Sequence, residues 1–307
     1  MRVIPSHSIL MLTGLILAPL LPGVINRTKA VFAGRHGAPL FQTYRDIFKL
    51  LRKSAVYSRT TTWIFRANPA LGLAAIVMIT ALLPMAQLAA PLSFTGDFIL
   101  FAYALGLMRF LTIIAALDTG SSFEGMGASR EAQFSALAEP ALIVGLAALV
   151  CATGRLSLSG IFAALGTAPA ANIPAIVLVA AALLIVFLAE NSRIPVDDPN
   201  THLELTMIHE VMILDYSGPD LAMILYAATL KLWVLGALIV NLALALTDLR
   251  GAVLAAAFAG GMLVLAVAVG IIESSMARLS LIKVPRLLAG ALVLAVLAFS
   301  FIVRSAT

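Results

Sequence analysis

The feature that most constrains this sequence is a succession of apolar runs, each near 20 residues long. An α-helix rises about 1.5 Å per residue, so about 20 apolar residues cross a bilayer core roughly 30 Å thick. Of the 307 residues, 62% are hydrophobic and 11% are charged, whereas soluble domains carry about 25% charged residues. The alternating segments of about 10 residues that are typical of membrane β-barrels are missing. We therefore expect an all-α membrane protein.

The runs predict eight spans in a single polytopic domain that covers residues 1–307. Residues 3–25 resemble a signal peptide in length, but they lack a clear small-residue cleavage site and end in Pro22-Gly23 before a basic loop. We interpret this run as a retained first span. The expected spans are 3–25, 68–89, 98–117, 137–153, 174–190, 221–246, 252–272 and 286–303.

The basic residues of the loops are distributed unevenly between the two sides of the predicted bundle. Basic residues concentrate in cytoplasmic loops, so the richer side predicts the orientation. The loops after odd-numbered spans hold Arg27, Lys29, Arg35, Arg45, Lys49, Arg52, Lys53, Arg59, Arg66, Arg130, Arg193, Arg278, Lys283 and Arg286. The opposite side holds Arg2, Arg155, Arg250 and Arg304. Odd loops are therefore expected in the cytoplasm, and both termini on the other side.

The first loop contains a second type of helix, at about 39–57, with the sequence PLFQTYRDIFKLLRKSAVY. Leu40, Tyr44 and Phe48 fall on one side at helical spacing, and Arg45 and Lys49 on the other. This pattern predicts an amphipathic helix on the cytoplasmic membrane surface. Such a helix either anchors the chain to lipid or forms one wall of a mouth that opens to the membrane.

An acidic cytoplasmic loop, at about 190–220, is the polar centre of the chain and holds two of its four histidines. Polar groups beside hydrocarbon are costly to desolvate, so this density suggests a function. Residues 197–201 predict a turn, followed by a helix from His202 to Leu214 whose apolar residues indicate packing rather than a free loop. His202 and His209 are seven apart, a poor spacing for chelation, so no metal site is predicted.

Several charges fall inside the spans, where ionisable residues usually face the bundle interior and pair. We expect Arg109 to be paired, and Lys231 to be either an ion-pair partner or a proton relay. Glu139 precedes Pro140 and is interpreted either as a helix N-terminal carboxylate or as a functional group. Glu273 ends span seven on the cytoplasmic side, where the helix dipole disfavours an anion, so either a partner such as Arg278 or a functional role is expected.

Other chemistries find little support. The single cysteine, Cys151, excludes an iron–sulfur cluster on this chain. We find no phosphate-binding loop, no dinucleotide fingerprint and no nucleophile–base pair, so no catalytic residue is predicted. Nucleic-acid binding is a poor interpretation, because the basic stretch is short. The glycines of TGSSFEGMG (119–127) predict a flexible loop, and Ser129, Arg130 and Glu131 are available to a partner.

Three segments carry a resemblance to a known family: GRHGAPLFQTYRDIFKLLRK (34–53), LDTGSSFEGMGASREAQFSALAEP (117–140) and LAENSRIPVDDPNTHLELTMIHEVMILDYSGPDLAM (188–223). They resemble the membrane subunit, called subunit 1 or H in complex I, that complex I shares with group 4 [NiFe] hydrogenases. The amino-acid sequence of these segments is most similar to that of the formate hydrogenlyase and hydrogenase-4 branch of the family. Asn200 and His202 stand where the complex I pattern is more acidic.

The resemblance implies a subunit at the junction of two arms, in the bacterial inner membrane. It implies a peripheral arm that consists of hydrogenase large and small subunits and an iron–sulfur subunit, and this arm holds the nickel–iron centre and the iron–sulfur clusters. It also implies antiporter-like subunits in the membrane arm. Lipid is the other expected partner. It implies no cofactor on this chain. For the proton or ion path, the resemblance implies the acidic residues Glu139, Glu190, Asp197, Asp198, Glu204, Glu210 and Glu273. We add two basic candidates to this path, His209 and Lys231. The expected docking surface, or former quinone mouth, is Arg35, Gln42, Arg45, Asp46, Lys49, Ser129, Arg130 and Arg193.

The expected function is that of a non-redox anchor that couples electron transfer to proton or sodium translocation in a formate hydrogenlyase-type complex. Three alternatives stay open. They are the quinone-binding subunit of a respiratory NADH:quinone oxidoreductase, a scaffold without an ion path, and a stand-alone transporter. The last is disfavoured because paired repeats and broken helices are not evident.

Overall fold

The computed structural model describes residues 6–167, 169–197 and 207–306, and the regular elements in this part of the chain are helices. Seven of these helices are long and apolar enough to cross a membrane. They are α4 (Trp63–Leu82), α5 (Asp97–Asp118), α6 (Ser122–Thr153), α8 (Ile173–Glu190), α9 (Gly218–Leu244), α10 (Gly251–Ser275) and α11 (Val284–Ala306).

The expected first span is a bent pair of helices, α1 (Ser6–Leu17) and α2 (Leu20–Phe32), which meet at 47°. Counted as one span, the pair brings the total to eight. The break falls at Pro19, because proline has no N–H and its ring displaces the carbonyl one turn earlier. That carbonyl, of Leu15, accepts a hydrogen bond from the Tyr226 hydroxyl (2.8 Å). The Tyr44 hydroxyl donates to the Ile16 carbonyl (2.6 Å).

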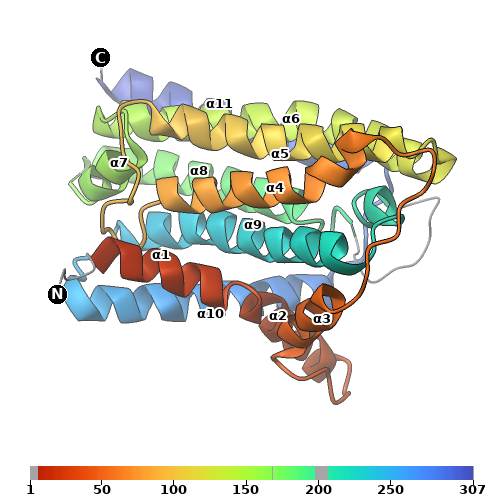
Figure 1. Cartoon of the computed structure of the whole chain (residues 1–307). Helices are drawn as coiled ribbons and strands as arrows, with labels where there is room; N and C mark the ends of the chain where they lie inside the picture. The colour runs from red at the N-terminus through yellow and green to blue at the C-terminus, as the bar shows by residue number, and fades with distance from the viewer. Residues whose placement is uncertain (1–5, 168, 198–206, 307) are drawn as a thin grey trace.

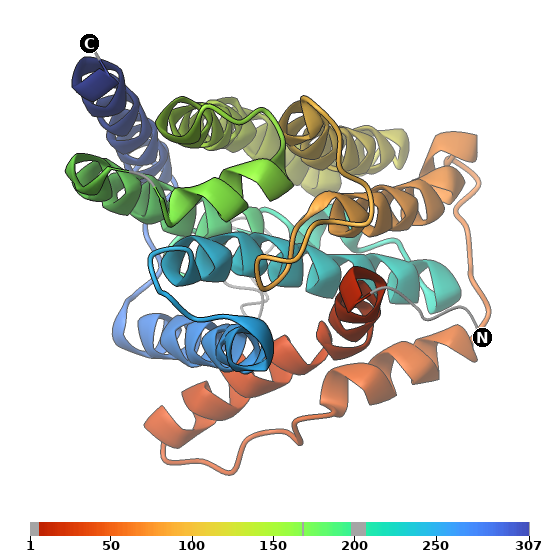
Figure 2. The same cartoon turned by 90° about the vertical axis from the view of Figure 1, so that its left-hand side faces the viewer.

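The spans lie side by side, and both termini are at the same end of the bundle (Figure 1). α9 is the most buried of the candidate spans and packs against α4, α8 and α10. α11 packs on α6 and α8, and α10 packs on α2 (Figure 2). Hydrophobic burial in the interior of the bundle therefore centres on α9.

Both boundaries of α4 differ from the expected ones. α4 begins at Trp63, not 68, because the Thr62 side chain caps its first turn and Asp118 accepts hydrogen bonds from the Thr62 N–H (2.7 Å) and hydroxyl (2.9 Å). It ends at Leu82, not 89, because Leu83 is extended before Pro84.

α6 begins at Ser122, whereas we expected a flexible loop over 119–127 and a span from 137. A helix tolerates glycine in its interior where close packing against another segment requires it. A side chain at Gly127 would meet the Val211 side chain at 2.3 Å and the Ile208 carbonyl oxygen at 2.9 Å. This glycine therefore serves a close approach between α6 and the segment 207–213, and not flexibility.

The helix predicted from His202 to Leu214 is wrong in the part that the structure describes. Residues 198–206 lie outside the described residues, and the continuation is a turn followed by a short 3₁₀-helix, η2 (Glu210–Ile213). The prediction that this segment is packed is confirmed, because Met207, Ile208, Val211 and Met212 are buried.

The remaining short helices lie between the spans. α3 (Gln42–Leu51) occupies part of the amphipathic stretch predicted at 39–57 and has no buried residue. It runs crosswise to the spans, seen nearly end-on in Figure 1 and from the side in Figure 2. α7 (Leu158–Leu165) and η1 (Ala170–Asn172) lie in the connection from α6 to α8.

Candidate functional site: a buried ion-pair cluster beside a cavity

Arg109 on α5 is the centre of a buried group of charges. Only 6% of the residue is exposed. Its Nε lies 3.1 Å from Glu131 Oε1, its Nη1 contacts Glu139, and its Nη2 contacts Glu190. Because a guanidinium presents several donors in a fixed fork, one arginine can hold three carboxylates that come from two helices, α6 and α8. The prediction that Arg109 is paired is confirmed.

Two further residues extend this group. Lys231 on α9 is 7% exposed, and its Nζ lies 3.8 Å from Glu190 Oε2. The His209 Nδ1 lies 3.7 Å from Glu131 Oε2, a distance that a bound water or a small movement can bridge. We call Arg109, Glu131, Glu139, Glu190, His209 and Lys231 the Arg109 cluster.

The charges of the Arg109 cluster are not balanced. Three carboxylates face two cations, Arg109 and Lys231, which leaves one negative charge in excess when His209 is neutral. The Glu139 side chain is 41% exposed, so the excess charge lies at the edge of the cluster. The more deeply buried carboxylates, Glu131 and Glu190, face the two cations Arg109 and Lys231.

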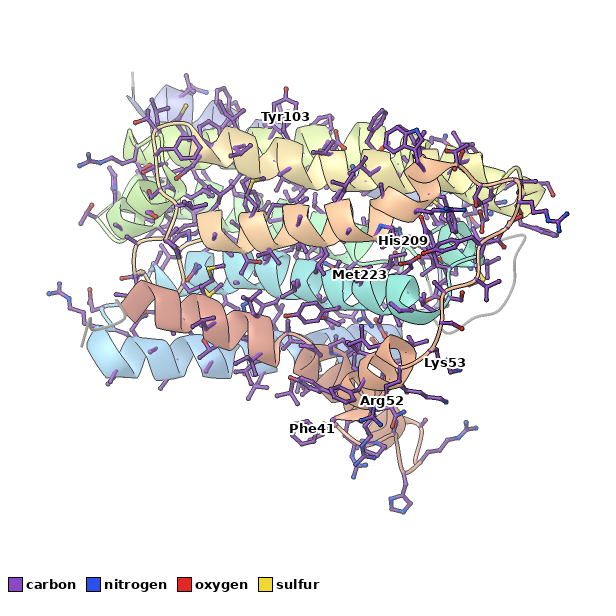
Figure 3. All side chains as sticks on the ribbon, in the orientation of Figure 1. Phe41, Arg52, Lys53, Tyr103, His209 and Met223 are labelled. Carbon is purple, nitrogen blue, oxygen red and sulfur yellow. The ribbon has the colours of Figure 1, made fainter. Side chains whose placement is uncertain are left out.

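A cavity of about 400 Å³ lies beside the Arg109 cluster. Glu190, His209 and Lys231 line it, and so do Thr43 and Asp46 of α3. Between these polar groups its wall includes Pro69, Gly72, Leu73 and Met108. Figure 3 shows His209 at the end of the bundle where Arg52 and Lys53 of the first loop lie. The cavity therefore connects the amphipathic helix with the buried charges.

Glu273 and Asp197 have partners of their own outside the Arg109 cluster. Glu273 pairs with Lys29 on α2 (2.7 Å) and with Arg193 (3.3 Å), so the expectation that Arg278 is its partner is wrong. Arg278 instead pairs with Asp197 (2.9 Å), which also accepts hydrogen bonds from the N–H groups of Ile208 and His209 (3.2 Å each). Asp197 thereby holds His209 in place.

The expected path residues thus separate into groups. Glu139, Glu190, His209 and Lys231 come together, and Glu210 lines the cavity. Glu139 lies in the interior of α6, so its interpretation as a helix N-terminal carboxylate is wrong. Asp198 and Glu204 lie outside the described residues.

The expected docking residues also have different surroundings. Asp46 and Arg193 line the cavity, and the Gln42 amide donates to Asp46 (2.8 Å). Arg130 donates to the Met207 carbonyl (2.8 Å) and so supports the segment that carries His209. Arg35, Arg45, Lys49 and Ser129 are exposed or partly exposed at the same end of the bundle.

Sequence reasoning assigned Glu131 to a partner-facing loop and missed its place beside Arg109. The missed signal was its spacing: Glu131 precedes Glu139 by eight residues, about two helical turns, so both lie near one face of α6. Recognising the helix from Ser122 onward would have shown it. Among residues 6–167, 169–197 and 207–306, no group of three His, Cys, Asp or Glu side chains is placed to hold a metal ion.

Tyr216 fixes the far end of the segment that carries His209. Its ring stacks on Phe65 (centroids 3.9 Å apart, 4° between planes), its hydroxyl donates to the Phe65 carbonyl (2.9 Å), and it accepts from the Asn68 amide (3.1 Å). Burial raises the pKa of the Tyr216 hydroxyl above its ordinary value, because the phenolate is disfavoured away from water. The hydroxyl therefore stays a donor.

Comparison with known proteins shows the family. A family model described as NADH dehydrogenase matches residues 6–304. The chain belongs to this family. It is 32% identical over 276 residues to formate hydrogenlyase subunit 4 of Escherichia coli (strain K12), over 88% of this chain and 89% of that protein. It is also 32% identical over 228 residues to hydrogenase-4 component C of the same organism, over 74% of this chain and 71% of that protein.

The fold of this family member is shared with a solved membrane complex. The structure of the membrane-bound sulfane sulfur reductase, an archaeal respiratory membrane complex, contains a chain that superposes with a TM-score of 0.79 at 18% identity. The match covers 95% of this chain and 98% of that one. Together with the apolar helices, the relatives establish a multi-pass membrane protein of the complex I-like group.

Proposed function

We propose that this chain is the membrane anchor and coupling subunit of a formate hydrogenlyase-type [NiFe]-hydrogenase complex. The observation that carries the proposal is the Arg109 cluster, which places a connected and largely buried set of charges beside a cavity. Buried ionisable groups in membrane helices mark ion pathways and proton relays. The likeness to formate hydrogenlyase subunit 4 and hydrogenase-4 component C supports the assignment to a hydrogenase complex.

The ion that this cluster suits is the proton. A sodium site needs several oxygen ligands without a competing cation. The carboxylates of the Arg109 cluster contact Arg109, and Glu190 also has Lys231 nearby. A proton can bind among such pairs by exchanging partners, with the cavity as its route to water. Cluster carboxylates and Lys231 would carry it, while Asp197 and Glu273, each held by basic side chains, would position the elements.

The end of the bundle that carries α3 would face the cytoplasm and the peripheral arm. Fourteen of the eighteen basic residues outside the spans belong to the loops expected there. Exposed Arg45, Lys49 and Ser129 are available at that end for hydrogenase and iron–sulfur subunits. The antiporter-like subunits would contact the membrane-facing sides of the spans. The complex would then lie in the bacterial inner membrane.

The assignment is tested by purifying the complex through a tag on this chain. We expect nickel and hydrogenase subunits to copurify, and formate to support hydrogen evolution without added quinone. A preparation that lacks nickel and reduces a quinone with NADH would contradict the proposal. Deletion of this chain should release the hydrogenase subunits from the membrane fraction.

A second candidate, a quinone-binding subunit of a respiratory complex, is favoured by one observation. Apolar and polar side chains both line the cavity, and α3 contributes to its wall, which suits an amphiphilic ring compound. Inhibition of the purified complex by a quinone-site inhibitor would favour this candidate. Hydrogen evolution that is unaffected by such an inhibitor would leave the cavity as a water-filled proton route.

A further inference from the structure

We propose that a second pocket, between α2 and α10, binds the phosphate headgroup of an anionic phospholipid. The pocket is open, measures about 510 Å³, and is lined by Lys29, Arg35 and His36, the polar side chains of Asn26 and Ser274, and apolar residues of α2. Basic pockets beside spans at the cytoplasmic end of membrane proteins are suited to acidic lipid headgroups.

The charge of this pocket favours an anion. Among the residues that the structure describes, no carboxylate lines it. Lys29 pairs with Glu273, but Glu273 is also held by Arg193, so the three charges sum to a positive excess. Arg35 adds a further cation, and its side chain is exposed. A phosphate would therefore meet Arg35, Lys29 and the side-chain amide of Asn26.

The loop that carries Arg35 and His36 is folded back on α2. Gly34 has a positive φ of 64°, which reverses the chain directly after the helix. The Arg35 N–H donates to the Ala30 carbonyl (2.9 Å), and Arg27 donates to the Gly37 carbonyl (3.3 Å). A side chain at Gly37 would meet the Ala30 Cβ at 2.5 Å. These contacts hold the loop at the edge of the pocket before a ligand binds.

Apolar surface continues from the pocket along the helices. Val31 and Phe32 on α2 are 69% and 60% exposed. On α10, the exposed Val267 and Ile271 lie at helical spacing below Ser274, on the face next to the α2 crossing at Gly270. A lipid satisfies both parts of this surface, with its phosphate in the pocket and its chains along the stripe. An acidic protein segment would leave the apolar part uncovered.

The position of the pocket agrees with a lipid headgroup. Figure 1 shows α2 and the loop after it at the α3 end of the bundle, where they extend away from the spans. α3, with exposed Phe48 and Leu51 and with exposed Phe41 directly before it, runs crosswise beside them. An amphipathic helix in this arrangement is typical of the bilayer interface. The pocket would then lie at headgroup depth.

The proposal is tested by native mass spectrometry of the purified complex, titrated with 1-palmitoyl-2-oleoyl phosphatidylglycerol or the matching phosphatidylcholine. We expect Arg35→Gln to weaken phosphatidylglycerol binding about fivefold, since each basic residue near a membrane surface contributes about that much. Arg35→Lys should keep most of the affinity. The matched control is Arg155→Gln, which removes an exposed arginine between α6 and α7.

Three results would overturn the proposal. One is equal loss of phosphatidylglycerol in Arg35→Gln and Arg155→Gln. Another is displacement of the lipid by millimolar inorganic phosphate, which would show a site for free phosphate. The third is unchanged lipid binding with loss of a peripheral subunit from Arg35→Gln, which would show a protein contact. None of these readouts depends on hydrogenase activity, so the lipid site and the proposed coupling function can fail separately.

Discussion

Arg109 is the residue on which the buried charges depend, because its guanidinium contacts Glu131, Glu139 and Glu190 together. Removal of one member of a buried ion pair is more damaging than replacement of the whole pair by apolar groups, since the remaining charge loses its partner. The arginine therefore has a structural role that is separable from any movement of a proton. Its substitution tests the cluster before any question of coupling is asked.

We predict that Arg109→Ala destabilises the protein by about 3 to 5 kcal/mol, the range for an uncompensated buried charge. Thermal unfolding of the purified protein in detergent measures the effect. The double variant Arg109→Ala/Glu190→Gln should recover part of the loss, because one unpaired carboxylate becomes neutral. Additive effects of the two substitutions would contradict a direct interaction.

His209 lies between the cavity and Glu131, and its backbone is held by Asp197. We predict that His209→Ala lowers proton translocation per hydrogen evolved while leaving hydrogen evolution with an uncoupler close to wild type. Added imidazole should restore part of the translocation, because the cavity of about 400 Å³ is large enough to admit it. Arg155→Ala, which removes an exposed basic side chain outside this cavity and outside the lipid pocket, is the control. Equal loss in both variants would argue against a relay at His209.

At the scale of elements, the sequence predicted those helices whose signal is local. Apolar runs predicted the spans, and helical spacing of basic and apolar residues predicted α3. The start of α6 was missed because the glycines of TGSSFEGMG indicate a loop when read alone. The packing of Gly127 against the segment 207–213 is a contact between distant parts of the chain, which local pattern does not record.

The same contact gives a prediction for Gly127. We expect Gly127→Ala to destabilise the junction of α6 with the segment 207–213, because the added Cβ would meet Val211 and the Ile208 carbonyl. Gly125→Ala is the matched control: nothing lies within 4 Å of its added Cβ, and alanine favours a helix by up to about 1 kcal/mol. Limited proteolysis and thermal unfolding should show a loss for the first variant and no loss for the second.

At the scale of the whole molecule, the membrane class and the span number follow from composition and run length, but the pairing of charges does not. Their position within the predicted spans brought Glu139, Glu190 and Lys231 forward as candidates. Proximity in sequence suggested Arg278 for Glu273, whereas Lys29 and Arg193 are the partners. Partners on different helices depend on how the bundle closes. That closure depends on packing around α9, which no single segment reveals.

The orientation of the bundle remains a prediction with a direct test. Single cysteines introduced into the Cys151→Ser background at Arg52 and at Asp248 should react from opposite sides of the membrane. Impermeant maleimide should label the Arg52→Cys variant only after the cytoplasmic face is opened, and the Asp248→Cys variant in intact cells. The reverse pattern would show that α3 and the cavity face outward.

The central claim is that the Arg109 cluster carries protons that couple hydrogen evolution to a gradient. The most direct measurement is the number of protons translocated per hydrogen evolved by the complex in proteoliposomes, for wild type, Glu190→Gln and the exposed control Asp248→Asn. We predict that Glu190→Gln evolves hydrogen with an uncoupler at close to the wild-type rate but translocates few protons, while the control behaves as wild type. An unchanged ratio in Glu190→Gln, with the complex intact, would contradict the claim and leave the chain as a scaffold.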